Sequence, residues 1–139
     1  MATVSLTERR PLVLIVDDNQ DTRDLYETGL QFAGFGTVLS ADGSDGFISA
    51  RNSRPDAVVT DLSLPGLDGW QLIRRLRADP FTSGIPVVIV TEWTAPTMMD
   101  RASDLRSVQV LIKPCLPDTL AGELRRTLTG LHESAKHTA

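Results

Sequence analysis

The residues of this sequence best suited to chemistry are aspartates that directly follow short apolar runs. Asp61 follows the run Ala57–Thr60, and Asp17 and Asp18 follow Leu12–Val16. A carboxylate can attack phosphorus and form an aspartyl phosphate, and neighbouring carboxylates repel one another unless a cation neutralises them. Hard oxygen ligands of this kind suit Mg²⁺, which commonly also binds phosphate oxygens. The aspartates therefore predict phosphoryl transfer to Asp61 beside a magnesium site.

A hydroxyl and an ammonium group follow apolar runs later in the chain. Thr91 comes after residues 87–90, and Lys113 comes after residues 108–112. Both groups can donate hydrogen bonds to a phosphoryl group and stabilise its charge. Each of these polar residues also has an ordinary alternative role, as a helix cap, a solvated lysine or a plain strand residue. The prediction therefore depends on all of them meeting at one place.

The segments that must position these residues alternate between two patterns. Short β-branched runs without helical periodicity favour buried strands, and amphipathic stretches favour helices. The expected strands are residues 12–16, 37–40, 57–60, 87–90 with Thr91 at the end, and 108–112. The expected helices are residues 20–33, a weak helix around 47–50, one from about 68 to before 79, one starting near 94–96, and 117–131.

The apolar spacing within three of these helices predicts which side of each is buried. In the first helix, Leu25, Gly29, Phe32 and Ala33 form the expected apolar pattern. Met98, Ala102 and Leu105 share one face of the fourth, and leucines 120, 124, 128 and 131 form one stripe along the last. These faces should pack against the sheet.

Five strands alternating with five helices predict an α/β fold. It should be a doubly wound five-stranded parallel sheet, with helices on both faces and right-handed crossovers. In such a sheet the carboxyl ends of the strands meet at one edge, where open α/β sheets bind ligands. The expected organisation is a polar lead over residues 1–11, one domain over 11–131 and a polar tail over 132–139.

The composition of the chain limits which partners it could bind and in which cellular compartment we expect it. The net charge is −4, with 14 basic and 18 acidic residues, which disfavours binding to nucleic acid or to anionic membranes. Cys115 is the only cysteine, so no internal disulfide can form, and no apolar run reaches membrane-spanning length. We therefore expect a cytoplasmic protein with neither a nucleic-acid nor a membrane partner.

The motifs LVLIVDD, VVTDLSLPGLDG, VVIVT and LIKP, in this order, resemble those of response-regulator receiver domains. These are the phosphoacceptor modules of two-component signalling, and the resemblance, to the single-domain chemotaxis-Y-like type, covers residues 11–131. It implies a flavodoxin-like fold with strand order 2-1-3-4-5 and Mg²⁺ held by Asp17, Asp18, Asp61 and the backbone carbonyl of Ser63. It also implies that Asp61 is phosphorylated, that Thr91 is a switch hydroxyl, that Lys113 contacts the phosphate and that the Lys113–Pro114 bond is cis.

Three positions depart from the family pattern. Glu92 stands where the family usually has a small residue, and a carboxylate facing the site would repel a phosphoryl group. Val110 replaces the usual Tyr or Phe, so it has no ring to rotate with the switch hydroxyl. Cys115 replaces the Phe of the common Lys-Pro-Phe, and we interpret it as a small core residue. Trp93 is a further candidate modulator of access to the site.

The resemblance implies a stand-alone response regulator that takes its phosphoryl group from a sensor histidine kinase or a histidine phosphotransfer protein. It would not be an enzyme, although it would assist its own Mg²⁺-dependent phosphorylation. Output would pass to a protein partner through the fourth helix, fifth strand and fifth helix, with Met98, Arg101 and Leu105 as candidate contacts. The alternative, motivated by Glu92 and Val110, is an interaction module that works without phosphorylation.

Enzymes built on the same layout are a less favoured class. A dehalogenase-type phosphohydrolase would need an Asp-x-Asp sequence after the first strand, where this chain has the adjacent pair Asp17 and Asp18. A flavin-binding protein would need a phosphate loop rich in glycine and hydroxyl groups there, and acidic residues would repel the phosphate.

Overall fold

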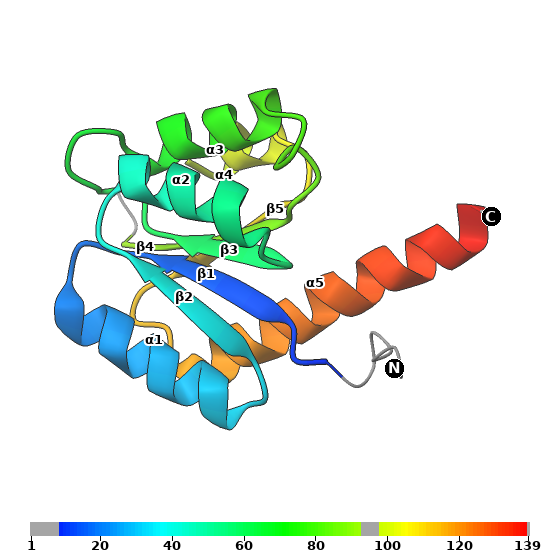
Figure 1. Ribbon diagram of the computed structural model, residues 1–139, viewed down its shortest axis with the longest axis horizontal. Helices are drawn as coiled ribbons and strands as arrows, with labels where there is room; N and C mark the ends of the chain where they lie inside the picture. Colours follow the sequence, from blue (N-terminus) through cyan, green and yellow to red (C-terminus); the bar gives the residue numbers. More distant parts are fainter. Residues whose placement is uncertain (1–8, 93–97, 139) are drawn as a thin grey trace.

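Strands and helices alternate strictly along the chain. The computed structural model describes residues 9–92 and 98–138, with side chains through residue 130. In chain order the elements are β1 (Leu12–Val16), α1 (Gln20–Phe32), β2 (Gly36–Ser40), α2 (Gly43–Ser53), β3 (Ala57–Thr60), α3 (Gly69–Ala78), β4 (Val87–Thr91), α4 (Met98–Ser103), β5 (Val108–Ile112) and α5 (Pro117–Thr138). The five strands form one parallel sheet in the order β2-β1-β3-β4-β5 (Figure 1). The predicted strand order and fold class are confirmed.

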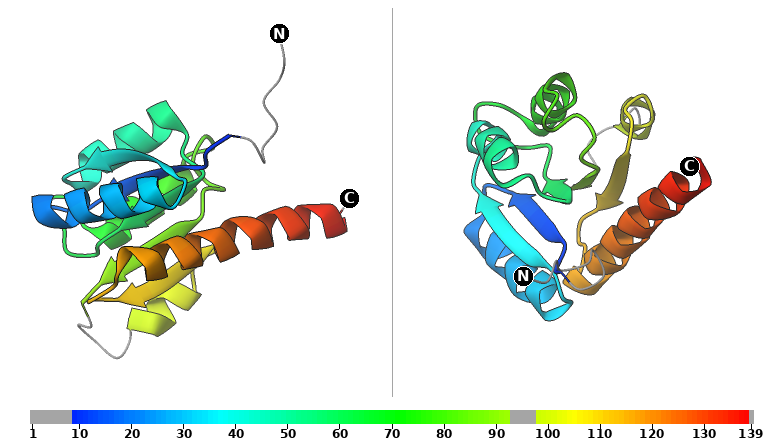
Figure 2. Two further views of the ribbon diagram at one scale, coloured as in Figure 1. Left: turned by 90° about the horizontal axis from the view of Figure 1, so that it is seen from below. Right: turned by 45° about the vertical axis from the view of Figure 1, so that its right-hand side comes forward.

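The sheet is buried on both faces because its inner strands carry apolar side chains at successive positions. Helices α1 and α5 cover one face and α2, α3 and α4 the other (Figure 2). Side chains alternate between the faces, so neighbouring residues of one strand enter different cores. The core under α1 and α5 includes Val13, Ile15, Val59, Val88 and Val90. The core under α2 and α3 includes Leu14, Val16, Val58, Val87 and Ile89.

Side-chain caps fix where three helices begin. The Asn19 side chain accepts a hydrogen bond from the Thr22 amide at the start of α1, and Asp42 caps α2 through the Asp45 amide. Helix α3 begins with a capping box between Asp68 and Gln71. Each cap satisfies amide groups that have no partner within the helix. The polar residues at the strand ends therefore stay in short loops at one edge of the sheet.

The buried side of α1 differs from the prediction. Leu25 and Phe32 were expected in the core, but they are 54% and 93% exposed. Helix α1 instead buries Tyr26 and Leu30. Its packing on α5 selects this side, because a side chain added at Gly29 would overlap Pro117. The prediction was wrong because several faces of this helix carry apolar residues, and the approach of α5 is not visible in local spacing.

The two C-terminal helices agree with the predicted faces where they are described. Met98 and Ala102 of α4 are buried, and Leu105 packs against the core just after that helix ends. Leu120 and Leu124 of α5 are buried and Leu128 is partly buried, whereas the side chain of Leu131 lies outside the description. Helix α5 continues to Thr138, into the stretch 132–139 that was expected to be a polar tail. The predicted helix start at Thr94 and Pro96 lies outside the described residues.

Candidate functional site

The carboxyl ends of four strands bring distant polar residues to one edge of the sheet. Backbone hydrogen bonds continue past the strands, from the Asp61 amide to the Val16 carbonyl at 3.1 Å and from the Lys113 amide to the Thr91 carbonyl at 2.8 Å. Asp17 is tied in the same way to β2, because its amide donates to the Ser40 carbonyl at 3.1 Å. These bonds fix the backbone from which the predicted side chains project.

One ammonium group joins two of the predicted carboxylates. Lys113 Nζ donates to Asp61 Oδ2 at 2.8 Å and to Asp17 Oδ2 at 3.1 Å. Both aspartates are buried, with Asp17 3% and Asp61 8% exposed. Removing one partner of such a pair is costly, because the other charge would be left buried without compensation.

The other oxygen of each carboxylate also accepts hydrogen bonds. Asp61 Oδ1 accepts from Thr91 Oγ1 at 2.7 Å and from the Ser63 amide at 3.0 Å. Asp17 Oδ1 accepts from the Asn19 amide at 2.9 Å. Both carboxylates are thus held in fixed orientations by donors on both oxygens.

The hydrogen bonds decide the charge state of Asp61 and Lys113. Burial alone would raise the pKa of Asp61, but hydrogen bonds from Lys113, the Ser63 amide and Thr91 outweigh it and lower that pKa. Burial alone would lower the pKa of Lys113, but its bonds to Asp61 and Asp17 raise it instead. Asp61 is therefore an anion and Lys113 a cation at neutral pH, as a nucleophile and an electrostatic partner require.

The loop after β3 packs closely against Asp61. The Gly69 amide donates to the Leu62 carbonyl at 3.0 Å, and a side chain at position 69 would overlap the Asp61 carbonyl. Gly66 adopts a φ of +70°, which favours glycine. These two glycines let the chain turn back over Asp61 and start α3 beside it.

Among the predicted metal ligands, the Asp18 side chain is placed less centrally than expected, whereas the Ser63 backbone is bonded to Asp61. Asp18 and Ser63 are exposed, and in the described part of the chain the Asp18 side chain takes part in no hydrogen bond or ion pair. The expectation that three carboxylates converge is wrong, because no three Asp, Glu, His or Cys side chains among the described residues are grouped to hold a metal ion. Asp18 lies in a bend after β1 and is exposed, so of the adjacent pair only the Asp17 carboxylate reaches the Lys113 ammonium in this structure.

The remaining pair still fits a magnesium ion. Asp17 and Asp61 aim one oxygen each at a single cation, which in this structure is the Lys113 ammonium. Magnesium typically takes one or two protein carboxylates and keeps several waters. The donor set of this edge therefore suits Mg²⁺, with Asp18 and Ser63 nearby in the sequence.

The three candidate modulators have different surroundings. Glu92 is exposed, and it makes no hydrogen bond or ion pair with any residue that the structure describes. Val110 is partly buried and packs on the core under α2 and α3. Trp93 lies outside the described residues. An effect of any of these three residues on phosphorylation stays a prediction.

Two residues that support the site were not predicted from the sequence. Tyr26 Oη donates to the Cys115 carbonyl at 2.9 Å, beside the Lys113–Pro114 bond, which is cis as the resemblance implied. Burial raises the pKa of Tyr26 to about 12, so the hydroxyl remains a donor at neutral pH. Arg23 Nη1 donates to the Asp17 carbonyl at 2.7 Å. The only feature of the sequence that could have indicated a role for Arg23 is its position, one turn into the helix after the acidic pair. No local feature of the sequence indicated a role for Tyr26.

Comparison with protein families adds a match over most of the chain. A family model described as the response regulator receiver domain matches residues 13–125.

Within the described residues, no helix has both the length and the apolar character needed to cross a bilayer.

Curated relatives include regulators named for DNA binding. The DNA-binding response regulator MtrA of Mycolicibacterium smegmatis is 34% identical over 119 residues, which cover 86% of this chain and 51% of MtrA. The transcriptional regulatory protein PrrA of Mycobacterium tuberculosis is 32% identical over 120 residues, covering 85% of this chain and 50% of PrrA. The chain spans about half the length of these curated relatives.

Solved structures similar to this one are receiver-type proteins. The chemotaxis protein CheY4 of Vibrio cholerae matches with a TM-score of 0.79 and 27% identity, covering 85% of this chain and 98% of that one. The receiver domain of the sensor histidine kinase PA1611 of Pseudomonas aeruginosa matches with a TM-score of 0.75 and 28% identity, covering 86% and 98%. That structure has a magnesium ion coordinated in its active-site cleft.

The relatives contradict the partners expected from the sequence. We expected no nucleic-acid partner and output through protein contact alone. This expectation is wrong, because the relative MtrA is named as a DNA-binding regulator. The argument from a net charge of −4 failed because it describes only this chain, whereas MtrA and PrrA are about twice as long. The expectation that the chain acts as a stand-alone regulator stays a prediction.

Proposed function

This chain belongs to the response regulator receiver domain family of two-component signalling, and from that premise we propose that Asp61 accepts a phosphoryl group from a phosphohistidine donor. The observation that carries the proposal is the set of bonds to Asp61, whose two oxygens accept from Lys113, Thr91 and the Ser63 amide. A charged, buried carboxylate beside a cation and a hydroxyl donor is suited to attack phosphorus.

In the proposed reaction an oxygen of Asp61 forms a bond to phosphorus as the bond between phosphorus and the donor imidazole nitrogen breaks. The imidazole leaves with the electron pair of that bond and takes up a proton from water. Lys113 and Thr91 then exchange part of their bonding to Asp61 for bonds to phosphoryl oxygens, which lie on the same side of the sheet edge. The receiver thus assists its own phosphorylation, and the kinase or phosphotransfer protein supplies the phosphoryl group.

Asp17 and Asp61 would hold Mg²⁺, with Asp18 and the Ser63 carbonyl as the further ligands that family membership implies. When bound, the ion supplies positive charge that neutralises phosphoryl oxygens. Asp17 thereby gains a second role besides its ion pair with Lys113. The magnesium ion in the Pseudomonas aeruginosa receiver supports this assignment.

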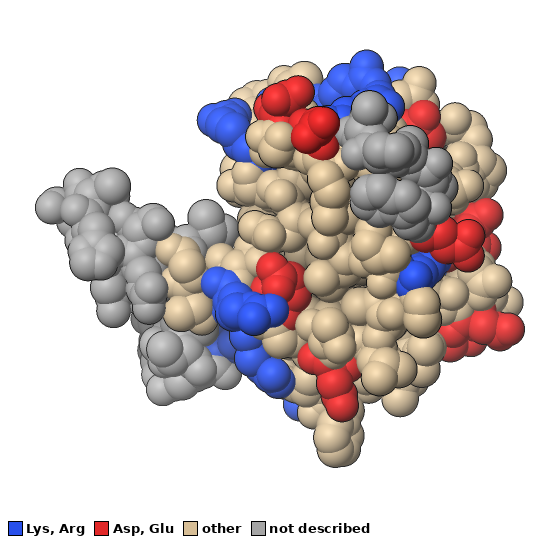
Figure 3. All heavy atoms as spheres, turned by 180° about the vertical axis from the view of Figure 1, so that it is seen from behind, with Lys and Arg blue, Asp and Glu red and all other residues tan. Residues whose placement is uncertain are grey.

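We further infer that the phosphorylated receiver controls a DNA-binding regulator. MtrA and PrrA, named as DNA-binding and transcriptional regulatory proteins, support this inference. On the described part of the face drawn in Figure 3, groups of basic side chains lie next to acidic ones. The net charge of the chain is −4, which does not favour direct contact with nucleic acid. The DNA contact would therefore be made by another segment or by another protein.

Phosphorylation can be tested with acetyl phosphate as a small donor. We expect Mg²⁺-dependent addition of one phosphoryl group, measured as intact mass, and complete loss of this addition in Asp61→Asn. Asp24→Asn makes the same chemical change at an exposed position of α1 and should be labelled like the original protein. Absence of labelling by both acetyl phosphate and a phosphorylated histidine phosphotransfer protein would refute the proposal. That result would favour the alternative of an interaction module that works without phosphorylation.

A further inference from the structure

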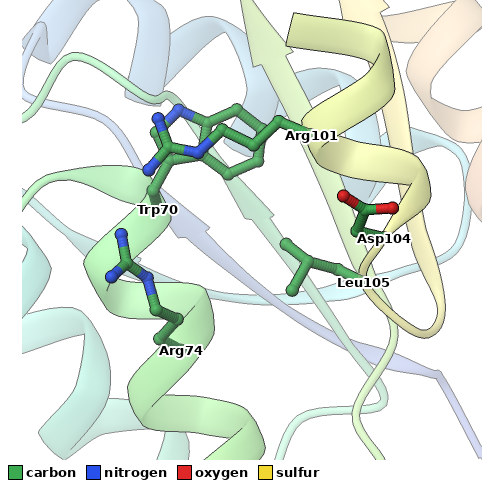
Figure 4. Close-up of a pocket in the computed structure, with 5 residues that line it drawn as sticks. All are labelled: Trp70, Arg74, Arg101, Asp104 and Leu105. Carbon is green, nitrogen blue, oxygen red and sulfur yellow. The ribbon is translucent and has the colours of Figure 1, made fainter.

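A hollow lies between α3 and α4, built from residues that the proposed phosphorylation site does not use. It has a volume of about 290 Å³ and is lined by Trp70, Arg74, Arg101, Asp104 and Leu105 (Figure 4). Trp70 and Arg74 lie one turn apart on α3, and Arg101 comes from α4. The two helices therefore contribute opposite walls.

The base of this α3–α4 pocket is aromatic and apolar. Trp70 and Leu105 both pack against the core under α2 and α3, which holds them in place. The Arg101 guanidinium lies over the Trp70 ring, 4.6 Å from its centroid, and joins the two helices (Figure 4). A guanidinium plane stacked on an indole presents a flat surface on which another planar group can stack.

The rim of the α3–α4 pocket carries more positive than negative charge. Arg74 and Arg101 supply two guanidinium groups, and Asp104 supplies one carboxylate. Among the residues that the structure describes, neither arginine has a carboxylate within ion-pair distance, in contrast to Arg51, which pairs with Asp79 at 3.0 Å. Guanidinium groups bind carboxylate and phosphate through pairs of parallel hydrogen bonds. The two arginines of the pocket are therefore available for an anion.

We propose that the α3–α4 pocket binds a small planar anion, an aromatic ring system that carries one phosphate or carboxylate. The ring would stack on the outer face of the Arg101 guanidinium, which lies over Trp70, the anionic group would bind Arg74, and Asp104 would accept a hydrogen bond from an amino group on the ring. The volume of about 290 Å³ lies at the lower end of small-molecule pockets, which suits a single mononucleotide and excludes a dinucleotide. This site is separate from Asp61 and its function does not depend on phosphorylation.

Adenosine monophosphate is a suitable probe because it combines a ring, an amino group and one phosphate. We expect saturable binding at a single site on the full chain, measured by isothermal titration calorimetry without magnesium or phosphodonor. Arg74→Gln should weaken binding about tenfold or more, the loss expected for a hydrogen bond to a charged group. Arg101→Gln should also weaken it, because it removes the guanidinium on which the ring stacks. Arg75→Gln changes the same charge on an exposed part of α3 outside the pocket and should bind like the original protein.

Adenosine and inorganic phosphate separate the two parts of the proposal. Each should bind much more weakly than adenosine monophosphate, because each lacks one of the two recognition elements. Equal binding of adenosine would contradict recognition of the anion, and equal binding of phosphate would contradict recognition of the ring. Absence of saturable binding by the monophosphate, or an equal loss in Arg75→Gln, would overturn the proposal. Asp61→Asn should leave this binding unchanged, so the phosphorylation proposal and this one can fail independently.

Discussion

At the scale of single residues, the site depends on Lys113 holding two carboxylates that would otherwise repel each other. Its ammonium contacts Asp61 and Asp17, which lie 52 and 96 positions away in the sequence. Each carboxylate has a second oxygen bound by other donors, so removing the lysine charge would leave both anions fixed and close together. The same residue therefore stabilises the resting protein and provides the cation for the proposed transfer.

The depressed pKa of Asp61 predicts how stability depends on pH. Because this pKa lies below the ordinary value of 3.8, the folded protein binds this proton more weakly than the unfolded chain does. The stabilising contribution of ionised Asp61 is thus present above the ordinary value and is lost as pH falls through the lower folded-state pKa. Between roughly pH 5 and pH 2, the free energy of unfolding, measured with urea, should decrease less steeply with falling pH in Asp61→Asn than in the original protein. Asp24→Asn, at an exposed position, should leave the slope unchanged, and equal slopes in all three proteins would contradict the assignment.

Residue types predicted the centre of the site but not its periphery. Asp17, Asp61, Thr91 and Lys113 were predicted because each follows an apolar run, and parallel strands bring such positions together. Asp18 was grouped with them by sequence adjacency, whereas the structure places it in a bend after β1, where its side chain is exposed. The bond from Tyr26 to the Cys115 carbonyl joins residues 89 positions apart and leaves no local trace in the sequence.

At the scale of elements, Arg77 connects three segments on the α3 side of the sheet. Its Nη1 donates to the Ile85 carbonyl at 2.7 Å, and its Nη2 donates to the Arg106 carbonyl at 2.9 Å. The end of α3 is thereby tied to the loop before β4 and to the turn before β5. The next residue in that turn, Ser107, has a φ of +55°, so the turn holds a backbone conformation that non-glycine residues rarely adopt.

We expect Arg77→Ala to lower the free energy of unfolding by about 1–3 kcal/mol, because it leaves these carbonyls without their charged donor. Arg77→Lys should recover only part of the loss, since one ammonium cannot reproduce the two-sided fork of a guanidinium. Urea unfolding of both variants beside Arg75→Ala, which changes an exposed arginine of the same helix, checks the prediction. An equally small effect of Arg77→Ala and Arg75→Ala would show that the connection is unimportant.

The contact between α1 and α5 makes a second prediction at this scale. A side chain at Gly29 would overlap Pro117, whereas a side chain at Gly122 of α5 would meet nothing within 4 Å. Gly29→Ala should therefore destabilise the protein by roughly 1–3 kcal/mol through overpacking. Gly122→Ala should stabilise it by about 0.5–1 kcal/mol, since alanine is the better helix former. Thermal unfolding of the two variants should show shifts of opposite sign, and shifts of the same sign would contradict the packing described.

The strands were the most predictable elements, and the sides of the helices the least. β1, β3 and β5 have the predicted bounds because an apolar, β-branched run is readable from neighbouring residues alone. The side that α1 buries depends on the partner helix, and Leu25 and Phe32 are exposed for that reason. The local sequence pattern therefore predicts whether a segment forms a strand or a helix. Packing between elements distant in the sequence decides which side of a helix is buried.

At the scale of the whole molecule, the fold separates two proposed functions in space. The proposed phosphorylation site lies where the strands end, and the proposed anion pocket lies between α3 and α4. Both are linked to the start of α3, because Gly69 packs on Asp61 and the next residue, Trp70, lines the pocket. The five-stranded parallel sheet was predictable from alternating strand and helix patterns, whereas its strand order was implied by the resemblance to receiver domains. The partners were not predictable, since the net charge of this chain says nothing about the additional length of MtrA and PrrA.

The most direct test of the central claim is to identify the residue that carries the phosphoryl group. The protein is phosphorylated with acetyl phosphate and Mg²⁺, and borohydride reduction then converts an aspartyl phosphate to homoserine, which peptide mass spectrometry locates. The account predicts homoserine at position 61 alone, with none in Asp61→Asn. Homoserine at another aspartate, or a phosphoryl group on a residue that borohydride does not reduce, would contradict it.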